Sequence, residues 1–241
     1  MLRPEVTFLN HGSFGACPKQ VFEVFQNWQR ELELHPADFF QRKSRALLDE
    51  ARAAMALYIG AEEDSVIFVT NASIGLNIIA RSLDLKPGDE VLSTDQEYGS
   101  LVHTWDLVCK MRGAKYVPMQ VDFPITSEEE VVEAIWSGVT DRTKVLFLSH
   151  ITSSTALKFP VERLIEKARE RDILTIIDGA HAPGQIPLDM RTIGADFYVG
   201  NCHKWMMAPK SVGFLYARKE VHDLLVPQVG GKARKLSGSS Q

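Results

Sequence analysis

The chain opens with two amphipathic helical patterns and then changes to short apolar runs. Apolar residues recur at helical spacing through 19–34, directly after Pro18, and again through 40–60, which closes on Gly60. From residue 65 onward, β-branched and aromatic runs alternate with longer amphipathic stretches. We therefore predict two N-terminal helices, followed by a regular alternation of strands and helices.

The alternating part of the chain defines the expected fold class. The strands are expected at 65–70, 90–94, 114–119, 144–150, 173–178, 195–200 and 211–217, and the intervening helices at 73–83, 100–113, 127–138 and 160–172. Ser127 and Glu130 fit a capping box, and Pro160 fits the first turn of its helix. This order predicts an α/β fold with a mostly parallel sheet flanked by helices. Ligands of such sheets bind at the carboxyl ends of the strands.

Composition narrows the choice of partners. The 241 residues are 45% hydrophobic and 24% charged, which is ordinary for a globular protein and suits one large domain, or one domain with a small appendage. A net charge of -4 gives no basic excess to neutralise phosphate backbones, which argues against a nucleic-acid partner. The three cysteines, Cys17, Cys109 and Cys202, lack the spacing of a disulfide framework or a metal pair, so no metal is predicted.

Hydropathy argues against a membrane partner. The longest apolar runs are far too short to span a bilayer, and the N-terminal residues lack the apolar stretch of a signal peptide. We therefore expect a cytoplasmic protein. Residues 231–241 are basic and rich in Gly and Ser, and we expect them to form a flexible tail.

The first two strand ends carry an anion-binding pattern and an aromatic residue. Asn71, Ala72 and Ser73 open a helix, where backbone N–H groups and the helix dipole attract anions. Taken alone, an ordinary N-cap by Asn71 or Ser73 is the simpler interpretation. Tyr98 follows the next strand and could stack on a flat ring, although packing alone would also explain it.

The next two strand ends carry hydroxyls, an imidazole and a carboxylate. The segment from His150 to Thr155 includes Ser153 and, by itself, is typical of a polar turn. Asp178 ends a nearly pure apolar strand, where a carboxylate is costly unless it is paired with a protonated ring nitrogen or an arginine. His181 follows it in a Gly/Ala/Pro turn that brings backbone close to a ligand.

The last strand end brings a lysine into apolar surroundings. Asn201 and His203 can donate to an anion, and Lys204 lies between His203 and Trp205. A lysine amine becomes a nucleophile when desolvation lowers its pKa. Together, these four strand-end features match what pyridoxal 5'-phosphate requires. The anion site suits its phosphate and the aromatic side chain its ring face, while the aspartate suits its ring nitrogen and the lysine its aldehyde.

Six motifs extend this reading to a family. The segments "FLNHGSFGACP", "TNAS", "DQEYGS", "SHITSSTAL", "DGAHAPGQIPLD" and "NCHKW" resemble the class V aminotransferases, and among them the isopenicillin N epimerase-like branch. The resemblance runs from about Phe8 to about Val226. It implies the fold type I architecture of pyridoxal-phosphate enzymes, a small amino-acid substrate, and a homodimer with active sites at the subunit boundary.

The resemblance also implies roles for single residues. Lys204 matches the Schiff-base lysine, Asp178 the aspartate at the pyridine nitrogen, and His181 the position beside the phenolic oxygen. Tyr98 matches the ring-stacking position, and Ser153 a position near the ring oxygen.

Two further groups of residues match by position. The phosphate loop is matched by Asn71, Ala72 and Ser73, with His203 and Asn201 completing it, and the segment over the substrate by Asn10, His11 and Gly12. The implied organisation is a substrate-covering segment over 1–20, a cofactor-binding large domain over 21–230 and the tail. The small C-terminal domain of the family, which carries the arginine for the substrate carboxylate, is expected to be missing.

The reaction is left open by these residues. Epimerisation at the α-carbon of an amino acid is the leading hypothesis, inherited from the branch. A β-lyase resembling the cysteine desulfhydrases and desulfurases, or an aminotransferase, is the alternative. A truncated cofactor-binding module without turnover is the non-enzymatic alternative, and an α/β domain in which these residues serve only as caps and core pairs is the plainest one.

Overall fold

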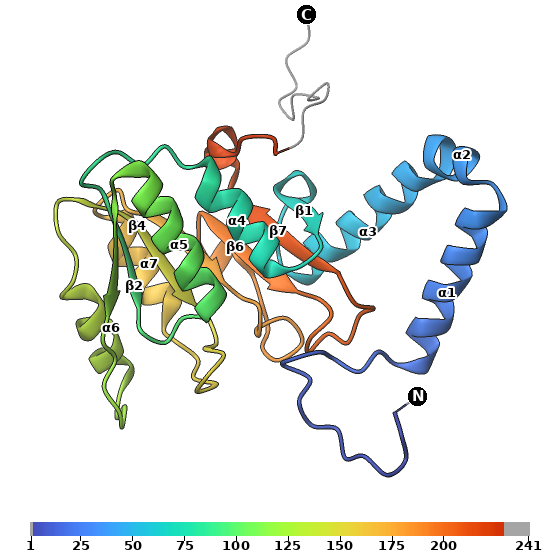
Figure 1. Cartoon of the computed structure of the whole chain (residues 1–241), viewed down its shortest axis with the longest axis horizontal. Helices are drawn as coiled ribbons and strands as arrows, with labels where there is room; N and C mark the ends of the chain where they lie inside the picture. The colour runs from blue at the N-terminus through green and yellow to red at the C-terminus, as the bar shows by residue number, and fades with distance from the viewer. Residues whose placement is uncertain (1, 229–241) are drawn as a thin grey trace, which may run out of the picture.

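The computed structural model describes residues 2–228, so the tail expected at 231–241 lies outside the described residues. The chain begins with an extended segment and a helical arm that projects from the body (Figure 1). The arm consists of α1 (Lys19–Leu34), α2 (Pro36–Asp38), the π-helical turn η1 (Phe39–Lys43) and α3 (Ser44–Tyr58).

The prediction of a single helix over 40–60 is wrong at the start of that range. The His35 ring accepts a hydrogen bond from the Asp38 N–H at 3.1 Å, and Pro36 lies in the first turn, so a new short helix begins at Pro36. The chain then passes through the π turn, in which the Ser44 N–H bonds to the Phe39 carbonyl, before α3 begins. Helical periodicity in a sequence does not distinguish this turn from α-helix.

Within the part of the chain that the structure describes, seven strands form one sheet, which confirms the mostly parallel α/β prediction. The strands are β1 (Val66–Val69), β2 (Glu90–Thr94), β3 (Lys115–Met119), β4 (Thr143–Ser149), β5 (Leu174–Asp178), β6 (Phe197–Asn201) and β7 (Gly213–Ala217). Their order is β1-β7-β6-β5-β4-β2-β3. Among the strands of residues 2–228, β7 alone runs opposite to the rest, because a turn-rich connection over 202–212 leads straight back from β6.

Helices cover both faces of the sheet. Those of the body are α4 (Ala72–Ser82), α5 (Gly99–Arg112), α6 (Glu128–Trp136), α7 (Val161–Arg169) and α8 (Met190–Ile193), with 3-10 turns η2 (Glu63–Ser65) and η3 (Lys219–Leu224). Alternate residues of β4 face opposite layers: Val145 and Phe147 pack with α4 and α5, and Leu146 and Leu148 pack with α6 and α7. Each such fully buried apolar side chain contributes about 1.5–3 kcal/mol.

The two helix starts that the sequence predicts, at Ser127 and at Pro160, are both observed, and the second needs a correction. The Ser127 hydroxyl accepts from the Glu130 N–H at 3.3 Å, as the capping box predicts. The Glu130 carboxylate reaches back beyond the start of the helix, where it also accepts from the Thr126 N–H at 2.9 Å. Pro160 is the residue directly before α7 rather than part of its first turn.

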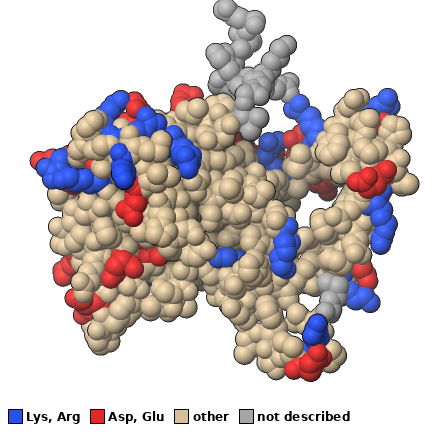
Figure 2. All heavy atoms as spheres, viewed as in Figure 1, with Lys and Arg blue, Asp and Glu red and all other residues tan. Residues whose placement is uncertain are grey.

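Surface charge is mixed. Figure 2 shows Lys and Arg side chains interspersed with Asp and Glu, separated by wide uncharged areas, on the visible face. Within residues 2–228, no helix has both the length and the apolar character that crossing a bilayer requires.

Candidate active site

A cavity of about 770 Å³ lies at the carboxyl ends of three adjacent strands, β4, β5 and β6. The predicted site residues that line it are Asn10, Gly12, Asn71, Ala72, Ser73, Tyr98, Ser153, Asp178, His181, Asn201, His203 and Lys204. Residues separated by almost 200 positions are therefore brought to one place, at the sheet edge where ligands of α/β folds bind. His11 is the one predicted residue that does not line the cavity.

Asp178 closes the floor of the cavity at the end of β5. Its residue is 4% exposed, and one carboxylate oxygen, Oδ1, accepts from the Ala180 N–H at 2.9 Å. Among the described residues, no hydrogen bond reaches Oδ2. Burial raises the pKa of Asp178, and the Ala180 N–H and the charge of Lys204 oppose this shift. A buried carboxyl group of this kind favours a cationic partner, and no cationic side chain within residues 2–228 bonds to it.

Lys204 reaches back over the cavity from the turn after β6. Its Nζ lies 3.0 Å from Nε2 of His181, and its side chain is half-buried. Burial lowers the pKa of Lys204, and Asp178 partly offsets that effect. Burial, and then the charge of Lys204, lowers the pKa of His181 to about 4. Both shifts favour neutral side chains.

Trp205 fixes the direction of the contact between His181 and Lys204. The Trp205 indole N–H donates to Nδ1 of His181 at 3.3 Å. A neutral imidazole that accepts at Nδ1 carries its hydrogen on Nε2. That hydrogen then points at the Lys204 nitrogen, which accepts it only as a neutral amine. A neutral, half-buried amine is a nucleophile and a base.

Side chains already bond to some of the N–H groups at the N-terminus of α4. The Asn71 side chain accepts from the Ile74 N–H at 2.9 Å, which confirms the N-cap interpretation. The Asn201 Oδ1 accepts from the Ala72 N–H at 2.8 Å. The Ser73 N–H and hydroxyl are without a partner within residues 2–228. The Ser73 N–H and hydroxyl are therefore available to bind an anion at the N-terminus of α4. Because the Asn201 side-chain oxygen already bonds to Ala72, only its amide N–H group is available to an anion.

Two rings border the cavity at its rim. Tyr98, the residue before α5, is 47% exposed and free to cover a ligand. His203 is buried, and its Nδ1 lies 2.9 Å from the Val212 carbonyl oxygen, which accepts the Nδ1–H. Nε2 of His203 is thus the ring nitrogen available to the cavity.

The strap, residues 10–16, crosses the backbone of the lysine turn. The Gly15 N–H donates to the His203 carbonyl at 2.8 Å, and the Lys210 ammonium donates to the Gly15 carbonyl. His11 lies behind the cavity wall, where its Nδ1 accepts from the Ala16 N–H at 3.2 Å and its ring packs on Trp205. His11 therefore holds the strap rather than facing the cavity.

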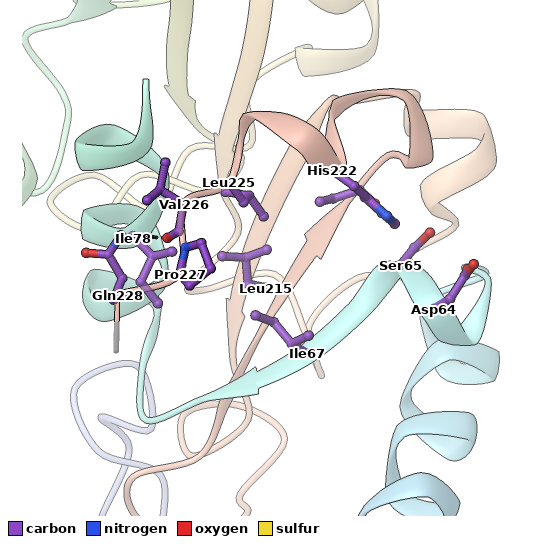
Figure 3. Close-up of a pocket in the computed structure, with 11 residues that line it drawn as sticks. Asp64, Ser65, Ile67, Ile78, Leu215, His222, Leu225, Val226, Pro227 and Gln228 are labelled. Atoms are coloured by element: carbon purple, nitrogen blue, oxygen red, sulfur yellow. Dashed lines mark hydrogen bonds between the residues drawn. The ribbon is translucent and has the colours of Figure 1, made fainter. Parts of the chain in front are cut away.

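A second cavity lacks comparable chemistry. It has a volume of about 420 Å³ and lies between β1, β7 and η3, lined mainly by apolar side chains such as Ile67, Leu215 and Leu225 (Figure 3). Its one imidazole, His222, is bonded through Nε2 to the Ala217 carbonyl at 2.9 Å. The candidate chemistry is thus concentrated in the cavity around Lys204.

Comparison with known proteins agrees with this geometry. The family model for "Aminotransferase class-V" matches residues 17–238. The chain belongs to the class V aminotransferase family. Its strands and Lys204 lie within the matched range, whereas the lining residues Asn10 to Phe14 precede it.

Two relatives and one solved structure are similar to this chain. Isopenicillin N epimerase of Amycolatopsis lactamdurans is 40% identical over 94% of this chain and 57% of its own length. A probable chloroplastic L-cysteine desulfhydrase of Arabidopsis thaliana is 29% identical over 95% of this chain and 52% of its own. A complex of the cystine C-S lyase C-DES with cysteine persulfide superposes with a TM-score of 0.86 at 22% identity, over 95% of this chain and 61% of that one. The chain thus spans about half to three-fifths of the length of these three proteins.

Some lining residues of this class V chain were missed by sequence reasoning. Phe14, Ser149, Gln185 and Trp205 all border the cavity. Ser149 is the last residue of β4 and lies in register with Asp178, so the strand-end rule that identified Asp178 could have found it. Phe14, Gln185 and Trp205 lie in loops, where no periodic signal marks the side that faces a ligand.

The polar groups that face the cavity fit a cationic ring that carries a phosphate. Among residues 2–228, Asp178 offers an unpartnered oxygen, Ser73 a free N–H and hydroxyl, and Lys204 a half-buried amine whose pKa is lowered by burial, all facing the same cavity. Within the described residues, no group of three or more His, Cys, Asp or Glu side chains is arranged to hold a metal ion.

Proposed function

We propose that this chain binds pyridoxal 5'-phosphate and uses it as an enzyme acting at the α-carbon of an amino acid. The observation that carries the proposal is the half-buried Lys204 amine, 3.0 Å from His181 in a cavity that also holds the buried Asp178. When bound, this cofactor supplies an electron sink for charge that develops at the α-carbon of a linked amine.

Each cavity group has a distinct task in this proposal. Asp178 would keep the ring nitrogen protonated, because an opposite charge stabilises its ionised form. Ser73 and His203 would bind the phosphate at the start of α4. Tyr98 would cover the ring, and Lys204 would hold the cofactor through its amine and would be the general base for the α-proton. His181, held by Trp205, directs its Nε2–H toward Lys204 or the ring oxygen.

Epimerisation is the leading reaction in our proposal. It is supported by the 40% identity to an isopenicillin N epimerase. The strap and Tyr98 lie at the rim of the cavity, where Asn10 and Gly12 would cover a small amino-acid-containing substrate. Segment 1–20 is then the substrate cover, and 21–230 the cofactor-binding domain.

A β-lyase is the second candidate, supported by the similarity to a probable L-cysteine desulfhydrase. None of the three cysteines lines the cavity: Cys109 and Cys202 are buried in the core, and Cys17 borders a different groove. A lyase built on this cavity would therefore release sulfide rather than pass sulfur to one of them. An aminotransferase reaction needs the same cavity groups.

A panel of amino acids separates these reactions. The purified protein, supplied with pyridoxal phosphate, is assayed for inverted α-carbon, keto acid and sulfide, alongside Lys204→Ala. Inversion alone indicates an epimerase, keto acid an aminotransferase, and sulfide with keto acid a β-lyase. Bound cofactor without consumption of any amino acid would favour the cofactor-binding module without turnover.

We also propose that the chain forms a homodimer in the cytoplasm. Helix α1 has no buried side chain, and it exposes Val21, Val24, Phe25 and Trp28 along the projecting arm. An apolar face of this kind marks an interaction site. Sedimentation over a range of concentrations tests the assembly: a monomer throughout would contradict it.

A further inference from the structure

A buried acid, Glu97, lies behind the cavity wall and has no role in the proposal above. It belongs to the loop between β2 and α5, directly before Tyr98, and its residue is 8% exposed. Its Oε1 accepts from the Thr94 hydroxyl at 2.7 Å, and its Oε2 lies 2.5 Å from the Ser149 hydroxyl. Glu97 therefore ties the Tyr98 loop to the ends of β2 and β4.

Ser149 connects this acid to the floor of the cavity. Ser149 and Asp178 are register partners on the parallel strands β4 and β5, and both line the cavity. Neighbouring register partners point to the same face of a sheet. Ser149 is therefore a neighbour of both acids: its hydroxyl bonds to Glu97, and its residue is in register with Asp178 on the same face of the sheet.

The surroundings of Glu97 favour its neutral form. Within residues 2–228, no Lys, Arg or His side chain bonds to Glu97, and the charged group that acts on it is Asp178, from β5. Tyr116, from β3, is the other titratable neighbour, and its pKa is raised chiefly by burial. Burial raises the pKa of Glu97 to about 8, against the opposing effect of the two hydroxyls. A neutral acid has one donor and one acceptor, so it can donate to Ser149 and free the serine hydrogen for Asp178.

We propose that Glu97 is a positioning residue of the cofactor cavity: a neutral acid that turns the Ser149 hydroxyl toward Asp178 and leaves Asp178 as the single negative charge beneath the ring. The part of this inference that concerns the ring rests on the proposed function. The protonation of Glu97 does not, and it is measurable in the protein without cofactor.

The first test is isotope-edited infrared spectroscopy of cofactor-free protein labelled with ¹³C-glutamate. Glu97→Gln is expected to remove a protonated-carboxyl band at neutral pH. Glu90→Gln is the matched control, because Glu90 is also buried but is paired with Arg142, and its pKa is lowered first by the Thr140 hydrogen bond. That control is expected to remove a carboxylate band. Loss of a carboxylate band in Glu97→Gln would overturn the proposal.

Wild-type protein makes this test independent of the variant. Its protonated-carboxyl band is expected to disappear as the pH rises, with a midpoint near 8. A band that is absent at neutral pH would overturn the proposal even if Glu97→Gln did not fold.

The second test follows the absorbance of bound pyridoxal phosphate as a function of pH. Wild type and Glu97→Gln are expected to overlap at neutral pH and to diverge above about 8, where Glu97 ionises. A difference already present at neutral pH, or overlap far above 8, would overturn the proposal. Ser149→Ala is expected to weaken cofactor binding by about tenfold or more, because the proposed hydrogen bond from Ser149 to the charged Asp178 could not form; unchanged affinity would overturn the role of Ser149. If no cofactor binds at all, the proposed function fails, and the infrared result still decides the state of Glu97.

Discussion

Gly15→Ala gives a steric test of the strap over Lys204. The backbone of Gly15 lies so close to the lysine turn that a Cβ atom there would be 1.9 Å from the Lys204 carbonyl oxygen and 2.7 Å from that of His203. Since real Cβ contacts stay above 3.0 Å, the strap must move away by more than 1 Å. The φ angle of Gly15 is not in the left-handed region, so the clash acts without backbone strain.

The expected magnitude follows from the two hydrogen bonds that the movement breaks. The Gly15 N–H loses the His203 carbonyl, and the Gly15 carbonyl loses the Lys210 ammonium. A neutral hydrogen bond is worth about 0.5–1.5 kcal/mol and one to a charged group about 1.5–3 kcal/mol, so the loss is about 2–4.5 kcal/mol. The detached population of the strap therefore rises roughly 30-fold or more.

Hydrogen exchange measured by mass spectrometry reports this change on peptides that cover the strap. Gly15→Ala is expected to lose protection there, while the sheet keeps its protection because the strap contributes little to the core. Gly99→Ala is the control, since a Cβ at Gly99 has no atom within 4 Å and the residue begins α5. A strap in Gly15→Ala that is as protected as in the wild type would refute the reasoning.

Two further predictions concern buried titratable groups. Burial raises the pKa of Asp178, so the cofactor-free fold is destabilised as the pH rises above the value of an unfolded aspartate; Asp178→Asn is expected to raise the thermal midpoint at neutral pH while abolishing turnover, and a lower midpoint would contradict this. Burial lowers the pKa of His150 to about 4. The negative charge of Glu162 opposes this shift, and the positive charge of Lys158 adds to it. Because the unfolded chain binds the proton first, stability is expected to fall as pH drops from about 6.5 to about 4, by up to about 1.4 kcal/mol per pH unit. Urea unfolding of His150→Gln should lack this component, and an unchanged acid dependence would contradict the assignment.

The strands were predictable because each is a short apolar run. All seven appear within two residues of the expected bounds, from β1 at Val66–Val69 to β7 at Gly213–Ala217. The reversed direction of β7 was not predictable, since it depends on a connection that packs against the strap. Helix α8, at Met190–Ile193, was also missed, because four residues carry no helical period.

The candidate site was predictable where chemistry follows a strand end. Asp178, Lys204 and the start of α4 are of this kind, and the structure places them in one cavity. Glu97 was not predictable, because a glutamate in a polar loop is usually exposed and only the tertiary contact with Ser149 buries it. The contribution of Trp205 depends equally on its contact with His181, because the sequence does not show that these two residues are neighbours.

The most direct test of the central claim is borohydride reduction of the protein in the presence of pyridoxal phosphate, followed by peptide mapping. The cavity assigns the reactive amine to Lys204, which is half-buried beside His181. The cofactor mass is expected on the peptide that contains Lys204, and Lys204→Ala is expected to lose both the label and the turnover. A label on a different lysine, or turnover that depends on pyridoxal phosphate in Lys204→Ala, would contradict the account.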